Sequence, residues 1–112
     1  MRGAPIAALV LAALPAMGAG LPSGAELFTR PDKGNCIACH QVPEGAGPAT
    51  RSDLGPRLQG ARMHELGRAR LRAIVVDPTA ANPDTVMPPY GKHRILDPAE
   101  IDRLVEYLDA LP

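Results

Sequence analysis

The sequence predicts an all-α domain of three to four short helices, and three observations lead to this fold class. Three segments combine apolar residues at helical spacing with residues that start or stop a helix. No convincing strand pattern surrounds the two cysteines, Cys36 and Cys39. Thirteen prolines and eleven glycines predict long loops between short helices, and the chain contains no internal repeat.

The first helix is predicted to begin after Ser23. The Ser23 side chain can accept a hydrogen bond from the first helical turn, while Glu26 reaches back to the Ser23 backbone, which is the pattern of a capping box. The helix that follows should bury Leu27 and Phe28.

The second helix is predicted over roughly residues 69–76, where three apolar residues share one face: Leu71, Ile74 and Val75. It should end at Asp77, because a residue that precedes proline avoids the helical backbone conformation.

The last helix carries the clearest signals. Asp97 caps it, Pro98 takes its first position and Glu100 its third. An apolar stripe then recurs at helical period: Ile101, Leu104, Val105 and Leu108. This stripe predicts core packing rather than a functional site.

The stretch Cys36-Ile37-Ala38-Cys39-His40 indicates covalent attachment of a c-type haem. The thiols of Cys36 and Cys39 can each add across one haem vinyl group, and the adjacent His40 is then placed to bind iron as the proximal ligand. The chain has no other cysteine. The motif therefore predicts one haem and an electron-transfer function.

Three other functions of a Cys-x-x-Cys pair are disfavoured: a zinc site, a redox-active dithiol and a structural disulfide. A closed zinc site needs four ligands, and only His64 and His93 remain to complete one. A catalytic dithiol usually lies between a strand and a helix, which the sequence around Cys36 does not suggest.

Residues 1–20 are predicted to be a secretory signal peptide, which leaves residues 21–112 as a monohaem domain. Arg2 supplies the positive start, a short apolar run follows, and small residues lie near Gly20. An uncleaved anchor is the alternative, but the apolar run between Pro5 and Pro15 is far shorter than the roughly 20 residues that span a bilayer. Because c-type haem is attached outside the bacterial inner membrane, the mature chain is expected in the periplasm.

About 92 residues with three aromatic side chains can form only a modest core, so a buried haem would add apolar bulk and a covalent staple. The formal net charge of zero gives no reason to expect nucleic acid or a lipid surface as a partner. Charge is nevertheless uneven along the chain. Basic residues crowd the middle and acidic residues the end: Arg51, Arg57, Arg62, Arg68, Arg70 and Arg72, then Asp97, Glu100, Asp102, Glu106 and Asp109. The two groups form two solvated faces, or alternatively some of the arginines offset haem propionates or meet an acidic partner.

A sixth iron ligand is sought among five residues: Met63, Met87, His64, His93 and Lys92. Met87 is the strongest candidate, because Pro88 and Pro89 fix the shape of its loop. A thioether ligand raises the reduction potential by favouring ferrous iron. His40/Met87 ligation would make a six-coordinate electron carrier.

Two further features resemble class I cytochromes c. Gly24 and Phe28 share a face of the first helix, and Leu104 and Tyr107 share a face of the last, as in the terminal helix crossing of that family. In the same family, the carbonyl of a Gly-Pro turn accepts a hydrogen bond from the proximal histidine. Two turns compete for this role: Gly55-Pro56, which we favour, and Gly47-Pro48. The resemblance implies that the helices wrap around the haem.

Longer segments resemble the SoxX family, the small monohaem subunits of the SoxAX cytochromes of bacterial sulfur oxidation. The most specific segment is residues 82–96, Asn-Pro-Asp-Thr-Val-Met-Pro-Pro-Tyr-Gly-Lys-His-Arg-Ile-Leu, and it is joined by residues 34–41, 53–56, 77–78 and the final helix. Residues 42–52 show nothing particular to the family.

This resemblance implies a heterodimer with a SoxA-like haem subunit that oxidatively couples thiosulfate to a cysteine of a SoxYZ-like carrier. The chain would be the electron-transfer subunit of an L-cysteine S-thiosulfotransferase complex and would pass electrons to a soluble cytochrome c. The family's haem thioethers correspond to Cys36 and Cys39, and its axial ligands to His40 and Met87. Both thiols are consumed by haem attachment, so the sulfur chemistry is expected on the partner. A free-standing diffusible electron carrier is the alternative, and a ligand-binding haem sensor is a more distant one.

Overall fold

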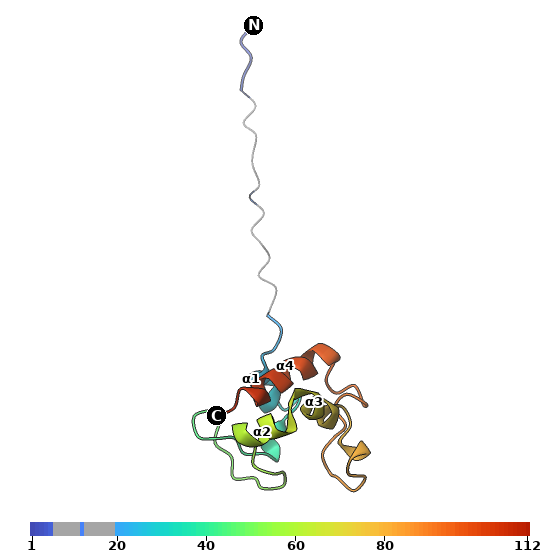
Figure 1. Ribbon diagram of the computed structural model, residues 1–112. Coiled ribbons are helices and arrows are strands. Elements are labelled where there is room, and N and C mark those ends of the chain that lie inside the picture. Colours follow the sequence, from blue (N-terminus) through green and yellow to red (C-terminus); the bar gives the residue numbers. More distant parts are fainter. Residues whose placement is uncertain (6–11, 13–19) are drawn as a thin grey trace.

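The structure, a computed structural model, describes residues 1–5, 12 and 20–112. In this part of the chain four helices form and no strand does (Figure 1). The helices are α1 (Gly24–Thr29), α2 (Gly60–Leu66), α3 (Arg68–Val76) and α4 (Pro98–Asp109), with short 3-10 turns η1 (Cys36–Ala38) and η2 (Pro78–Ala80). The predicted all-α class with three to four short helices is confirmed.

The predicted signal peptide falls mostly on residues that the structure does not describe, so it stays a prediction. Among the helices of the described segments, none has the length and apolar composition that crossing a bilayer requires.

The predicted caps of α1 and α4 are both present. At α1, the Glu26 N–H donates to Ser23 Oγ at 3.2 Å, and the Ser23 N–H donates to Glu26 Oε2 at 2.7 Å. At α4, Asp97 and Glu100 make the same reciprocal pair, at 2.7 and 3.1 Å. Each box satisfies backbone donors that the first helical turn would otherwise leave without a partner.

Helix α2 was not predicted from the sequence. Its residues alternate between charged and apolar without a wide apolar face, and only Gly60 and Met63 are buried. The helix is held instead by the C-terminus: the Gly60 N–H donates to the Pro112 carbonyl at 2.8 Å, and a Cβ at Gly60 would overlap the Leu111 carbonyl oxygen. A distant contact therefore starts this helix.

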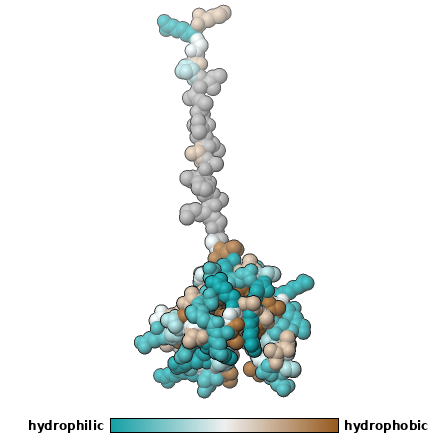
Figure 2. All heavy atoms as spheres, in the orientation of Figure 1, coloured by the Kyte–Doolittle hydropathy of each residue, from teal (hydrophilic) through white to brown (hydrophobic). Residues whose placement is uncertain are grey.

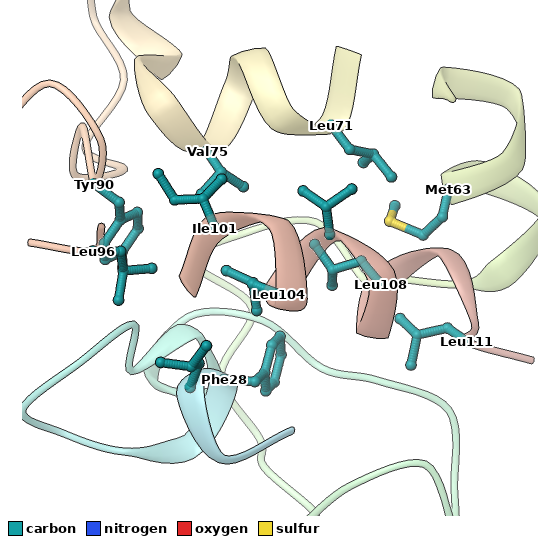
Figure 3. Packing of buried hydrophobic residues seen from close by; sticks show 12 residues of the cluster. Phe28, Met63, Leu71, Val75, Tyr90, Leu96, Ile101, Leu104, Leu108 and Leu111 are labelled. Atoms are coloured by element: carbon teal, nitrogen blue, oxygen red, sulfur yellow. The ribbon is translucent and has the colours of Figure 1, made fainter. Parts of the chain in front are cut away.

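Helix α4 lies at the centre of the core, with α1 on one side and α3 on the other (Figure 3). The close crossing predicted for α1 and α4 is present. A Cβ on Gly24 would overlap the Arg103 carbonyl oxygen, so only glycine lets the helices approach this closely. The rings of Phe28 and Tyr107 pack with their centroids 5.4 Å apart.

The uneven charge of the sequence is partly matched within the fold. Arg68 and Arg72 on α3 each lie 2.8 Å from a carboxylate of α4, that of Asp109 and Asp102 respectively. These pairs are largely solvent-exposed, so each contributes about 0–1 kcal/mol at most. Hydrophilic side chains cover most of the face shown in Figure 2, and hydrophobic atoms appear there only as small separate spots.

Candidate haem site

The cysteine-histidine motif forms one tight turn. Asn35 enters it with φ at 46°, a left-handed conformation that asparagine tolerates. Residues 36–38 then make the 3-10 turn η1, and the N–H groups of Cys39 and His40 both donate to the Cys36 carbonyl, at 3.1 and 2.9 Å. This turn brings both thiols and the imidazole to one short stretch of backbone.

The proximal imidazole is oriented by the loop that follows the motif. His40 Nδ1 lies 2.7 Å from the Pro56 carbonyl oxygen. Because a carbonyl can only accept a hydrogen bond, Nδ1 carries the proton and Nε2 keeps a lone pair that could bind iron. The Gly55 N–H donates to the Cys39 carbonyl at 2.8 Å, and a Cβ at Gly55 would overlap the His40 ring. Of the two competing turns, Gly55-Pro56 supports the histidine.

Both cysteines are partly buried, and no disulfide joins them. Burial raises the pKa of the Cys36 thiol to about 12. A redox-active dithiol depends on a cysteine whose pKa is lowered. Among the described residues, no three His, Cys, Asp or Glu side chains gather as they would around a metal ion. The geometry gives the zinc and dithiol alternatives no support.

A cavity of about 660 Å³ brings together the four residues predicted to hold the haem: Cys36, Cys39, His40 and Met87. Its volume lies within the roughly 300–1,000 Å³ of small-molecule and cofactor sites. Apolar side chains from all four helices and the loops between them line it: Phe28, Leu58, Met63, Leu66, Leu71, Ile74, Val75, Leu104 and Leu108. An apolar cavity with two thiols and an imidazole in its wall fits a covalently attached porphyrin.

Three arginines also line this cavity: Arg57, Arg62 and Arg70. Haem carries two propionate carboxylates, which guanidinium groups can bind. Two of the three arginines also have partners within the chain, since Arg57 donates to Gln41 and Arg62 to Glu65, each at 2.7 Å. In the sequence, the three arginines lie close to Arg68 and Arg72. Only the fold shows that Arg68 and Arg72 are paired with carboxylates of α4. Sequence alone therefore did not single out the three arginines of the cavity.

Met87 lies in the loop between η2 and α4, is partly buried, and donates its N–H to Thr85 Oγ1 at 3.1 Å. Met63 lines the same cavity, but it lies on α2, is 2% exposed and belongs to the core (Figure 3). Met63 therefore contributes to the packing of the core.

The other three candidates for the sixth ligand do not line the cavity. The His64 ring contacts the Asp109 carbonyl oxygen at 2.7 Å, and Lys92 lies 3.6 Å from Asp77. His93 is exposed. Met87 thus has the position that its predicted role requires, and the assignment of the axial ligands stays a prediction.

A second cavity, of about 510 Å³, lies between α3 and the start of α4. Its lining includes Lys33, Arg94 and Glu100 but no cysteine, histidine or methionine. It therefore offers nothing to attach or ligate a haem.

The comparison with protein families agrees with this site. The family model described as cytochrome C oxidase, cbb3-type, subunit III matches residues 19–108. The chain belongs to this family of c-type cytochrome domains. Neither the comparison with curated proteins nor that with solved structures found a match. For this cytochrome, family membership implies covalently bound haem c and a role in electron transfer.

Proposed function

We propose that this cytochrome relays single electrons through one haem c, with His40 and Met87 as the axial ligands. The observation that carries the proposal is the shared cavity, whose wall contains the oriented imidazole, both thiols and Met87. Bound haem supplies a one-electron iron couple, and a thioether ligand raises its potential. The test is the spectrum of the oxidised holoprotein, which should contain the far-red charge-transfer band of methionine-ligated ferric haem. A spectrum without that band would remove Met87 from the iron.

We further propose that the cytochrome is the electron-accepting subunit of a SoxAX-like complex in the periplasm. The support is the resemblance of residues 82–96 to the SoxX family. The reaction would join the outer sulfur of thiosulfate to a carrier cysteine thiolate, forming one sulfur–sulfur bond and releasing two electrons. With no thiol left after haem attachment, this chain would take up those electrons one at a time and pass them to a soluble cytochrome c.

An apolar pair at the cavity supports a partner subunit. Leu54 and Val86 come from the two loops that carry Pro56 and Met87, and both line the cavity. The polypeptide alone leaves Leu54 74% exposed and Val86 85% exposed. Bound haem would cover the parts of both side chains that face the cavity, and a partner subunit would pack on the parts that face away from it. The matched family name also denotes an oxidase subunit, which shows that domains of this type occur in enzyme complexes.

A diffusible electron carrier is the alternative. The face drawn in Figure 2 is mostly hydrophilic, which agrees with the small polar contact surface expected of a shuttle.

The deciding experiment is purification of the tagged cytochrome from native periplasm. The subunit proposal expects a second, larger haem protein in equal amount, and thiosulfate-dependent reduction when the carrier is added. Replacing both Leu54 and Val86 by Asp should release that partner, and the haem content and spectrum of the same sample show whether the cavity that they line is intact. A monomer that keeps its haem and binds no second haem subunit would favour the carrier.

A further inference from the structure

We infer that Tyr90 is a positioning residue for the sixth ligand: its phenol ties the Met87 loop to the haem-attachment turn. The inference rests on the proposed ligation of iron by Met87. It assigns a specific task to a side chain that the sequence marks only as one of three aromatics.

The tie is a buried hydrogen bond. Tyr90 Oη donates to the Gly34 carbonyl oxygen at 2.6 Å, and Tyr90 is 8% exposed. The two residues are 56 positions apart in the chain. Tyr90 also lines the haem cavity and lies beside Leu96 at one end of the core (Figure 3). Removing the phenol oxygen would leave a carbonyl without this partner in a buried place.

The acceptor end of the tie is fixed. The Gly34 N–H donates to the Leu27 carbonyl at 3.1 Å. A Cβ at Gly34 would lie 2.6 Å from that same oxygen and 3.0 Å from Cys36 Sγ. Gly34 is therefore wedged between α1 and the first thiol, and it cannot follow a moving loop.

The donor end is fixed as well. The Tyr90 carbonyl accepts from the N–H groups of Ile95 and Leu96, at 2.9 and 3.0 Å, while its own N–H donates to Pro88 at 3.1 Å. Two prolines separate Met87 from Tyr90, so the backbone between them has little freedom. A shift of the phenol would be transmitted to the thioether rather than absorbed by the loop.

Tyr107 provides a matched comparison. Its Oη also donates to a backbone carbonyl far away in the chain, that of Ala46, at 2.9 Å. Tyr107 lies on α4, does not line the haem cavity, and its acceptor belongs to the loop after the haem motif. Replacing either tyrosine by Phe removes one oxygen and one comparable hydrogen bond, but only Tyr90 is joined to Met87.

The test uses imidazole as a probe that competes with Met87 for ferric iron in the purified holoprotein. Tyr90→Phe should bind imidazole about tenfold more tightly than wild type, because one lost buried hydrogen bond is worth about that factor in an equilibrium. Its far-red band should also disappear at lower imidazole concentration. Tyr107→Phe should match wild type in both measurements. Both variants should unfold at a lower urea concentration than wild type, because each has lost one hydrogen bond.

A double variant distinguishes an effect on the position of Met87 from a general loss of protein stability. In a Met87→Ala background, adding Tyr90→Phe should leave imidazole affinity unchanged, because no thioether remains to be positioned. Equal imidazole affinity in wild type and Tyr90→Phe would overturn the inference, as would a Tyr90→Phe chain that binds no haem while Tyr107→Phe does. Wild-type protein without the far-red band would instead refute the ligation by Met87.

Discussion

His40 Nδ1 and the Pro56 carbonyl oxygen lie 2.7 Å apart, and this contact determines which imidazole nitrogen carries the proton. The proton sits on Nδ1, so Nε2 is the free donor. The contact also increases the basicity of the ring, as outer hydrogen bonds to metal-ligating histidines generally do. Gly55 makes the contact possible, since its backbone lies against the ring where any side chain would collide.

Gly55→Ala should therefore displace the proximal histidine. The added methyl overlaps the His40 ring and cannot move away, because the Gly55 N–H is bonded to the Cys39 carbonyl. We expect the affinity of the His40 imidazole for iron to fall by about 10- to 100-fold, the usual effect of disturbing a group that hydrogen-bonds to a metal ligand. The yield of haem-bound protein and its reduction potential report this weaker binding. Gly47→Ala is the control, because its Cβ would meet only Val42 and Tyr107, at 3.1 and 3.2 Å. Equal effects of the two variants would contradict the role of the Gly55-Pro56 turn.

Met87→Ala should open the iron to added ligands and lower the reduction potential, because the soft sulfur that favours ferrous iron is removed. The visible spectrum and a potentiometric titration report both changes. Met63→Ala is a stringent control, since Met63 lines the same cavity. That variant should lose about 2–5 kcal/mol of stability as a core truncation while keeping the wild-type spectrum. The reverse pattern would make Met63 the ligand.

Replacing both Cys36 and Cys39 by Ala should abolish holoprotein. The cavity walls are apolar and surround the site of the porphyrin, so a chain without thioethers has lost its covalent staple and keeps only a small core. Haem staining of denatured protein and far-ultraviolet circular dichroism measure the outcome. A stably folded double variant that retains haem through denaturation would show that attachment does not depend on these thiols.

The elements predicted correctly from sequence are those whose signals are local. The capping boxes at Ser23 and Asp97 and the stripe from Ile101 to Leu108 need only neighbouring residues, and all are present. Helix α2 escaped prediction because the C-terminal contact of Gly60 holds it in place.

The site shows the same division. The haem motif is local and was read directly. Sequence favoured Gly55-Pro56 over Gly47-Pro48 without excluding the second turn, and the contact of Pro56 with His40 decides between them. The sequence could not separate the arginines that line the cavity from those that pair with α4 either. The partners of Arg68 and Arg72 lie more than 25 positions away in the chain. The hydrogen bond from Tyr90 to Gly34 likewise could not be predicted from the sequence, because the two residues are 56 positions apart.

Lys33→Ala should destabilise the protein, because it removes the ion-pair partner of Glu100. This carboxylate is 5% exposed, and its Oε2 lies 2.8 Å from Lys33 Nζ. Removing the lysine leaves a buried charge without its partner, which should cost about 1–3 kcal/mol, since Lys33 itself is partly exposed. Urea unfolding of the holoprotein gives the value. Arg72→Ala is the control, because its pair with Asp102 is more exposed and should contribute at most about 1 kcal/mol. An equal loss in the two variants would mean that Glu100 finds another partner.

Glu26→Gln should lower stability in a pH-dependent way. Hydrogen bonds from the Ser23 backbone and side chain hold the pKa of the Glu26 carboxyl below its usual value of 4.5. A lowered folded-state pKa means that the carboxylate stabilises the fold above the unfolded-state pKa, and that this contribution disappears as the pH falls through the folded value. The wild type should therefore exceed the variant in stability at neutral pH, and the two should converge well below pH 4.5. Urea unfolding at a series of pH values measures this difference. A gap that stays constant or widens on acidification would show that the charge of Glu26 does not contribute to the cap.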